Sequence, residues 1–461
     1  MGGRASMLLV IGFSLIFMSL SNNFNTLSLK SIEGYTGYYS ETMAYNIAVS
    51  GANMAANQIF MDRTWDAGYS NLSLNGGVLN VYVSNTASGA SGKVKICHIP
   101  PGNYGARHTL EIPAAAVPAH LAHGDYLGVC DSAQGYSSQT ATIVSEGTYN
   151  GITKTINVEL RPASYAKYGN FYATMSAMPA TGDTFNGPFH VNGKLYTSGS
   201  PVFWGKVTSK SGLVMQGNPK NPKFYGGYET GVDIPNDFDT TGMRMNASKV
   251  FRDTTGSGKT TDVKLYFNAD GTVTYSNRIG TAAYSTPKTV PLTTLAPNGL
   301  IYVEKGNIYT KGTLNGRATI VASKKGAYGY GKVIMEDNLQ YNADPKTNPA
   351  STDMLGIVAE SDIRIQDNAN TRGKDIITQA SMYSVNGTVG PDDGLVTQSF
   401  LGSWKILGGV IAADTRVTAT YWGSTPIKGL RFVHRYDDRF MTAVPPFFPK
   451  TKYYEIVSWF E

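Results

Sequence analysis

Cysteine, histidine and charge are all scarce in this chain of 461 residues. It has two Cys, six His and 16% charged residues, and Lys and Arg exceed Asp and Glu by only six, 39 against 33. We find no basic stripe interleaved with aromatic residues, so we expect no nucleic-acid partner. The 51 Gly and 29 Tyr are typical of extracellular β-rich proteins, and the length is sufficient for two or three domains.

The two cysteines, Cys97 and Cys130, lie at the two ends of one segment bounded by Pro and Gly. Two cysteines that bracket a single segment fit one disulfide formed in an oxidising compartment. In the chain-entropy model, closing a loop of about 34 residues stabilises by roughly 3 to 4 kcal/mol. The sequence therefore predicts a Cys97–Cys130 disulfide and export from the cytoplasm.

The same segment holds four of the six histidines. His120 and His123 are three residues apart, so one helical turn would point both imidazoles the same way. His98 and His108 could complete the ligand set of a Zn or Cu ion, with Asp125 as an outer carboxylate or an alternative ligand. In the other interpretation the histidines cap turns and bond the backbone without a metal, and both stay open.

One long hydrophobic run exists, from Ala5 to Leu20, and no charged residue occurs between Ala5 and Leu29. As a helix, 25 uncharged residues reach roughly 37 Å, enough to cross a hydrocarbon core of about 30 Å. Arg4 precedes the run and the next Lys or Arg is Lys30, which favours a cytoplasmic N-terminus with the rest outside the cytoplasmic membrane. A cleaved secretory signal is the alternative, although no clear small-x-small site follows Leu20.

The helix is expected to continue beyond the hydrophobic run. Apolar residues between Ile32 and Phe60 recur mostly at multiples of three to four, which predicts one helix over residues 1–62. Gly34 and Gly37 mark an expected weak point, because a mid-helix Gly costs about 1 kcal/mol relative to Ala.

A helix that is hydrophobic first, amphipathic next and followed by a β-rich body resembles the stem of type IV pilins and pseudopilins. A pilin leader usually ends in Gly and the fifth mature residue is usually Glu; here Arg4 follows Gly3, and the fifth position is Leu8, or Ala5 if Met1 is the mature start. The resemblance implies a homopolymer built through this helix, which is inserted in the cytoplasmic membrane before assembly. The candidate assembly residues are Met7, Leu8, Leu9, Val10, Ile11, Phe13, Leu15, Ile16, Phe17 and Leu20.

The Cys/His segment also resembles a short module of secreted bacterial surface proteins. Residues 93–130 carry its pattern, CHxPPGN, then HT, then AVPAHLxHGDxxGxC. The resemblance implies export and a disulfide-linked unit but brings no chemistry with it. Asn71–Asn85 alternates like a strand, and Ala141–Pro162 reads as two strands around Asn150-Gly151. We therefore expect a β-sheet domain over residues 63–182, with the module inserted at 93–131.

The remaining chain, residues 183–461, consists of short β-prone runs with an apolar residue at every second position, punctuated by turns. Such runs are stable when stacked, which predicts a parallel β-solenoid; a large β-sandwich stays open. Between Gly299 and Ser323 the expected inward set is Ile301, Val303, Ile308, Leu314 and Ile320. Leu265–Tyr275 predicts a hairpin around Asp270-Gly271 that projects from this body.

Three C-terminal stretches resemble a bacterial envelope family of unknown function, which joins a pilin-like helix to a bactofilin-like β-solenoid. They are Tyr341–Pro349, Met354–Asn370 and Pro445–Glu461. With the helix and sheet above, the predicted fold class is α+β, mostly β: a long N-terminal helix, a β-sheet domain with a disulfide-linked insertion, and a large solenoid-like domain.

No catalytic constellation emerges from the sequence. Asp362, Asp367 and Asp375 are the candidates for a β-helix enzyme, and His190 and His434 are expected to be structural or surface histidines. We therefore predict a non-enzymatic structural subunit of an extracellular, type IV pilin-like filament. The alternative is a membrane-anchored, non-polymerising cell-surface protein that binds a metal or, through exposed Tyr and Trp, a glycan.

Overall fold

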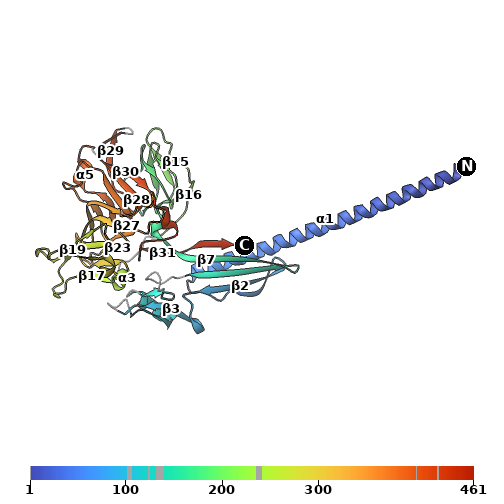
Figure 1. Cartoon of the computed structure of the whole chain (residues 1–461), viewed down its shortest axis with the longest axis horizontal. Coiled ribbons are helices and arrows are strands. Elements are labelled where there is room, and N and C mark those ends of the chain that lie inside the picture. Colours follow the sequence, from blue (N-terminus) through green and yellow to red (C-terminus); the bar gives the residue numbers. More distant parts are fainter. Residues whose placement is uncertain are drawn as a thin grey trace. The chain divides into compact units, whose positions relative to one another are not determined.

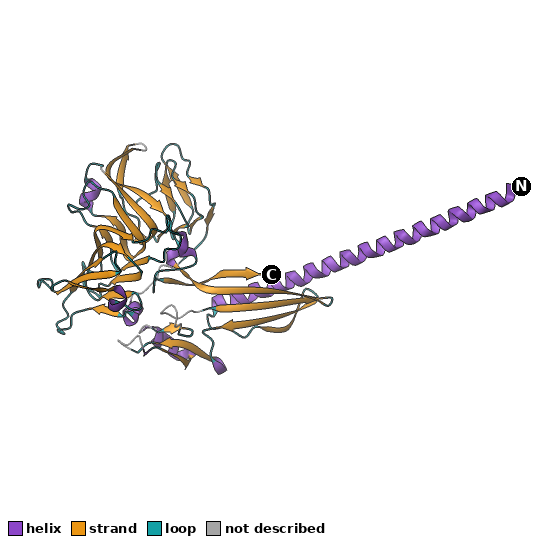
Figure 2. Cartoon of the chain, viewed as in Figure 1, coloured by secondary structure: helices purple, strands orange, loops and turns teal. Residues whose placement is uncertain are grey.

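The computed structural model describes residues 2–100, 106–122, 125–130, 140–234, 241–400, 402–422 and 425–461. Two compact units make up the chain: the first comprises Met1–Ser88, Thr140–Arg161 and Glu455–Glu461, and the second comprises Gly89–Gln139 and Pro162–Tyr454. One long helix is followed by a body composed mostly of strands (Figure 2). The predicted class, α+β and mostly β, is confirmed, whereas the boundaries at residues 62 and 182 stay predictions.

Helix α1 (Gly2–Met61) is continuous over 60 residues (Figure 1). Its sequence contains no Pro, the residue that most strongly breaks a helix interior. The helix also runs through Gly34 and Gly37. The expected weak point does not interrupt it, because two glycines cost only about 2 kcal/mol in total, within reach of a long helix.

The sheet of the first unit has the order β1-β2-β6-β7-β31. Its strands are β1 (Tyr69–Leu74), β2 (Gly77–Asn85), β6 (Ala141–Tyr149), β7 (Ile152–Ser164) and β31 (Lys450–Phe460). The predicted turn at Asn150-Gly151 joins β6 and β7, and both of its residues have positive φ, 48° and 80°, as a tight hairpin turn requires.

The C-terminal part of α1 packs against this sheet. Its fully buried residues are small or aliphatic: Ala44, Ile47, Ala48, Ala52, Ala55 and Ile59. They share the core with Leu79, Ile143 and Ile156 of the strands. Helix and sheet approach closely at Gly147, where a Cβ atom would overlap the carbonyl oxygen of Ala44.

The Cys/His module is a small three-stranded sheet with the order β4-β3-β5. Its elements are η1 (Ala90–Gly92), β3 (Lys93–His98), β4 (His108–Pro113), η3 (Ala114–Ala116), α2 (Val117–Ala122) and β5 (Tyr126–Leu127). The predicted Cys97–Cys130 disulfide is present, with an S–S distance of 1.99 Å.

The other strands of the second unit are mostly short. They are β8 (Asn170–Tyr172), β9 (Thr184–Phe185), β10 (Phe189–Val191), β11 (Leu195–Ser198), β12 (Val202–Phe203), β13 (Val207–Ser209), β14 (Leu213–Gln216), β15 (Lys223–Phe224), β16 (Tyr228–Thr230), β17 (Lys249–Phe251), β18 (Thr261–Phe267), β19 (Thr272–Ile279), β20 (Lys288–Pro291), β21 (Leu300–Val303), β22 (Ile308–Leu314), β23 (Arg317–Ala322), β24 (Val333–Tyr341), β25 (Met354–Ala359), β26 (Ile363–Ile365), β27 (Ile376–Pro391), β28 (Gly402–Asp414), β29 (Ala419–Trp422) and β30 (Thr425–Arg435). Short helices η4 (Tyr165–Lys167), α3 (Thr241–Asn246), α4 (Leu292–Leu295), α5 (Asp393–Thr397) and η5 (Asp438–Met441) connect them.

Parallel pairing dominates this part of the chain. One ladder has the order β17-β21-β23-β25-β27-β28-β8-β10-β13-β16, and every neighbouring pair in it is parallel. A second ladder joins β18, β22, β24 and β26 in the same way. Stacked coils of a solenoid produce such pairs, whereas sandwiches are largely antiparallel. The pairing therefore favours the solenoid interpretation over the sandwich.

Both faces of the first ladder are apolar. The predicted inward set, Ile301, Val303, Ile308, Leu314 and Ile320, is confirmed, since all five lie in one buried core cluster, to which the second ladder contributes Ile308 and Leu314. A second cluster on the opposite face contains Tyr302, Tyr383 and Ile411 together with Phe440, Phe447 and Phe448 from the segment after β30. The Arg317 guanidinium donates to the Val444 carbonyl over 2.8 Å and helps to hold this segment in place.

The predicted hairpin exists and its first strand, β18, belongs to the parallel stack, whereas the projection of the hairpin from the body stays a prediction. β18 and β19 are antiparallel around Asp270-Gly271, as expected. β18 also pairs in parallel with β22, and Val263, Leu265 and Phe267 are buried in the core. Alternation along β18 places these three apolar side chains on one side, which explains why the hairpin joins the stack.

Candidate functional site

Strand register brings His98 and Asp125 together in the Cys/His module. β3 pairs with β5 through Cys97 and Tyr126, so the residue after Cys97 lies opposite the residue before Tyr126. His120 comes from α2, and the Asp125 N–H donates to the His120 carbonyl over 3.1 Å. The disulfide closes the same corner, because Cys97 is also paired with Thr109, whose hydroxyl oxygen accepts the Cys130 N–H.

The carboxylate of Asp125 is the centre of this site. Its Oδ2 lies 2.8 Å from Nδ1 of His98 and 2.6 Å from Nδ1 of His120, and its Oδ1 accepts the Ile99 N–H over 2.9 Å. The Asp125 side chain is fully buried, whereas the two imidazoles are each about one quarter exposed. One buried acceptor thus orients two imidazole rings from separate elements.

Electrostatics favour the ionised form of Asp125. Burial by itself would raise the pKa of this carboxyl group. Hydrogen bonds from His98, the Ile99 N–H and His120 outweigh burial and hold the pKa below its usual value. Asp125 therefore carries a negative charge at neutral pH, which suits either imidazole N–H donors or a cation.

Three of the five predicted metal-site residues come together. Donor atoms of His98, His120 and Asp125 lie within 4.8 Å of one another, and nitrogen and carboxylate donors suit Zn or Cu. Direct ligation by all three would need ligand atoms about 3.3 Å apart, given bonds near 2.0 Å in a tetrahedron, so the present contacts would widen by a few tenths of an ångström. In the other arrangement Asp125 orients the imidazoles and the metal binds their outer nitrogens.

The other two predicted ligands are placed differently. The His108 ring lies 5.4 Å from the His98 ring, but its Nδ1 is 3.0 Å from the Ala106 carbonyl oxygen and it is outside the three-residue group. His123 lies outside the described residues. The sulfur atoms of Cys97 and Cys130 form the disulfide, so neither is available as a thiolate ligand.

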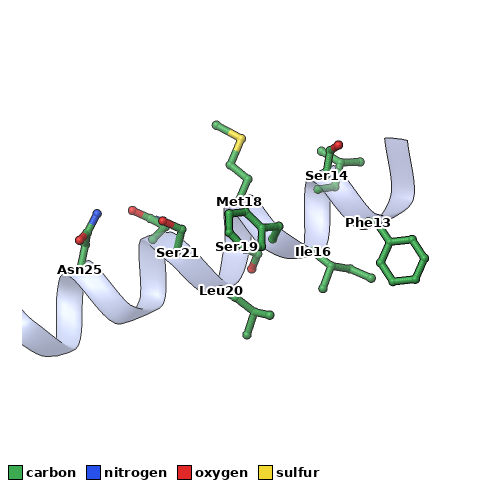
Figure 3. Close-up of a pocket in the computed structure, with 11 residues that line it drawn as sticks. Phe13, Ser14, Ile16, Met18, Ser19, Leu20, Ser21 and Asn25 are labelled. Carbon is green, nitrogen blue, oxygen red and sulfur yellow. The ribbon is translucent and has the colours of Figure 1, made fainter. Parts of the chain in front are cut away.

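The candidate assembly residues are all exposed on the N-terminal part of α1. Their exposed fractions run from 48% for Ile11 to 76% for Phe17. Figure 3 shows Phe13, Ile16 and Leu20 projecting from one side of the helix. Ser14, Met18, Ser21 and Asn25 project from the other side, so apolar side chains point to both sides. By length and composition α1 is able to cross a membrane.

The predicted structural histidines are confirmed as buried and bonded. Nδ1 and Nε2 of His190 lie 2.7 Å from the Thr208 hydroxyl and 2.8 Å from the Asn192 amide oxygen. His434 Nε2 contacts the Gly408 carbonyl oxygen at 3.0 Å. Burial lowers the pKa of both, to about 4 for His434, so both are neutral at physiological pH.

The acids considered for catalysis are each tied to a cation. Asp362 and Asp375 pair with Arg364 and Lys405 at 2.7 Å, and Asp367 pairs with Arg372. Each of the three carboxylates therefore has a structural partner in the described residues.

The second unit contains a cavity that the sequence patterns did not indicate. Its volume is about 350 Å³, and its lining includes Tyr172, Asp183, Trp404 and Phe432. Burial raises the pKa of Asp183 to about 6, although the Ala180 N–H and Tyr421 donate hydrogen bonds to it. The lining residues lie between 172 and 189 and between 389 and 432. These two stretches are far apart in the sequence and come together through the parallel pairing of β28 with β8.

Comparison with known proteins shows a likeness to a solved pilin structure. No protein-family model matches the chain, and no curated protein matches it. It is similar to the crystal structure of the competence-associated pilin ComZ from Thermus thermophilus, at 14% identity over 91% of this chain and 97% of that one, with a TM-score of 0.30. A likeness of this size says nothing about function, so the function proposed below rests on the chain's own residues.

Proposed function

We propose that this protein is the structural subunit of an extracellular, type IV pilin-like filament, assembled through the N-terminal part of α1. One observation carries the proposal. The same helix is buried at one end, where Ile47 and Ile59 are inaccessible to solvent, and exposed at the other, where Phe17 is 76% exposed.

The exposed part needs a nonaqueous partner. Burying a large apolar side chain is worth about 1.5 to 3 kcal/mol, so the ten candidate residues together represent a driving force of well over 10 kcal/mol. A helix apolar on all sides is stable in lipid or among other helices. Lipid would serve before assembly, and sister helices would serve in the filament.

Two features support a location outside the cytoplasm. The disulfide fits an oxidising compartment. The uncharged stretch between Arg4 and Lys30 is long enough to span the cytoplasmic membrane with the remaining chain on its outer side. We assign the protein no enzymatic activity.

Electron microscopy of sheared surface material tests the proposal. We expect fibres that contain this chain, and a mature N-terminus, measured by mass spectrometry, that retains residues up to Leu20. A variant lacking residues 2–29 keeps the packed part of α1, so we expect it to fold as a soluble monomer and to form no fibres. Fibres from this variant, or only detergent-released monomers from the full chain, would contradict the proposal.

The second candidate function is metal binding by a surface-anchored, non-polymerising protein, and the His98, His120 and Asp125 group favours it. We propose that this group holds Zn or Cu. Elemental analysis and Zn titration of chain purified without chelator would show about one ion per chain. Changing His98→Ala and His120→Ala together should abolish binding, while His108→Ala should retain it. If Zn or Cu cannot be restored to a metal-free preparation, the module is a disulfide-linked unit without a metal.

A further inference from the structure

Positive charge is concentrated in one part of the second unit. Residues 249–332 contain 12 Lys and Arg against 4 Asp and Glu, a net charge of +8, whereas the whole chain carries +6. This segment comprises β17 to β23 and the loop that leads into β24. The rest of the chain is therefore slightly acidic, and the small overall charge conceals a strongly basic region.

Two strands of this region present Lys and Tyr side by side. Lys264 and Tyr266 alternate with the buried residues of β18, so they occupy its outer face and are partly exposed. In the parallel register with β22, Lys264 pairs with Tyr309 and Tyr266 pairs with Lys311. The result is a two-by-two pattern of ammonium groups and phenol rings on one face.

Aromatic rings hold the cations of this face. The Lys264 ammonium and the Arg278 guanidinium each lie 4.9 Å from the ring centre of Tyr284, and the Lys311 ammonium lies 4.8 Å from that of Tyr266. A ring attracts a cation through its quadrupole without neutralising the charge. These contacts position the cations and leave the charges of Lys264 and Lys311 available to an external anion. We name Lys264, Tyr266, Arg278, Tyr284, Tyr309 and Lys311 the cationic tyrosine face.

Two carboxylates belong to the same face, and both already accept hydrogen bonds. Asp262 accepts from the Arg278 guanidinium at 3.0 and 2.7 Å, and its side chain is 3% exposed. Glu336 accepts the Tyr266 hydroxyl over 2.6 Å. Further cations, Lys259, Lys305 and Lys324 among them, lie in the loops that lead into β18, β22 and β24.

We propose that the cationic tyrosine face binds an acidic polysaccharide. Phenol rings offer apolar surface and a hydroxyl to sugar rings, and separate cations match carboxylates spaced along a glycan. A nucleic acid is a poorer fit, because its densely spaced phosphates would also meet the partly exposed carboxylate of Glu336. The inference rests on the proposed location outside the cell but not on polymerisation.

Binding of polygalacturonate to the full chain in detergent micelles tests the inference. The double variant Lys264→Gln, Lys311→Gln removes two cations that hold rings rather than carboxylates, so the fold should persist. We expect its affinity to fall roughly tenfold, the size expected of two exposed charge contacts, with a weaker salt dependence. The matched control Lys194→Gln, Lys220→Gln removes two exposed cations elsewhere in the same unit and should bind like the wild type.

Three results would overturn the inference. They are wild-type affinity in the Lys264, Lys311 variant, an equal loss in the control pair, and tighter wild-type binding of DNA than of polygalacturonate. A Tyr284→Ala variant adds a test of the rings, because it keeps every charge and should still weaken binding. The micelle assay is independent of fibre formation, so failure here and failure of the filament proposal are distinguishable.

Discussion

The two parts of α1 share one helix and have opposite surroundings. In the N-terminal part, large residues such as Leu8 and Phe17 are more than 70% exposed, and in the C-terminal part Ala48 and Ile47 are fully buried. The backbone is the same, so the difference lies in what packs against each part: strands β2 and β6 cover one side of the C-terminal part. Large apolar residues on all sides require a surrounding of lipid or other helices, whereas Ala and Gly on one side allow a sheet to approach.

A charge placed in the exposed part gives the largest expected effect. Phe17→Glu puts a carboxylate in the middle of the apolar run, at a cost of roughly 3 kcal/mol in each membrane-inserted helix. We expect fibres to disappear from electron micrographs of surface material, while the melting temperature of the body in detergent stays unchanged.

The control for Phe17→Glu adds the same charge to the packed part of the helix, at an exposed position. Asn53 is exposed, so Asn53→Glu should fold and assemble like the wild type. Fibres that persist in the Phe17 variant, or vanish equally in the Asn53 variant, would contradict the role given to the exposed part.

The second prediction concerns a truncation that should affect the packed part of α1 and spare the exposed part. Ile47→Ala removes a fully buried residue and should reduce the free energy of unfolding of the first unit by about 2 to 5 kcal/mol. Ile16→Ala makes the same change at a position that is 58% exposed and should leave that free energy within about 0.5 kcal/mol. Hydrogen exchange of β6 peptides in detergent measures both, and equal effects would contradict the assigned packing.

The third prediction uses two glycines of the same helix. At Gly51 an added Cβ would overlap Leu79 Cδ1 in the core, whereas at Gly34 it would meet nothing within 4 Å. Overpacking should cost Gly51→Ala about 1 to 3 kcal/mol, against a helix gain of about 1 kcal/mol. Gly34→Ala should show the gain alone. Thermal unfolding followed by circular dichroism would separate the two, and a stabilised Gly51 variant would refute the close approach.

Local patterns predicted much of the fold. The uncharged run predicted the helix, Asn150-Gly151 predicted the β6–β7 turn, and alternation predicted the core position of Ile320. These features depend on residues close in sequence. The β28–β8 pairing and the burial of β18 were not predictable, because the sequence of a strand does not specify which distant strand it pairs with.

The two candidate binding sites were hard to predict for the same reason, because they depend on contacts between distant segments. Crowding of histidines pointed to the module, but the choice of Asp125 and His120 as partners of His98 depends on how β3, β5 and α2 meet. The cationic tyrosine face was not predicted, because its Lys and Tyr residues alternate with core residues within each strand. They lie next to one another only through the β18–β22 register.

The smallest expected effect concerns one hydrogen bond between sheet and helix. The buried Ser145 hydroxyl of β6 donates to the Ala48 carbonyl of α1 over 2.7 Å. Ser145→Ala should cost the first unit about 1 kcal/mol, because the carbonyl keeps its helical bond and loses only its second donor. In the exposed part, Thr26 makes a similar bond to the Asn22 carbonyl over 2.9 Å, within the helix. Thr26→Ala should be neutral or slightly stabilising, since water replaces the hydroxyl and Ala is the better helix former. Urea unfolding in detergent measures the difference, and a larger loss for Thr26→Ala than for Ser145→Ala would mean that the exposed part of α1 makes protein contacts of its own.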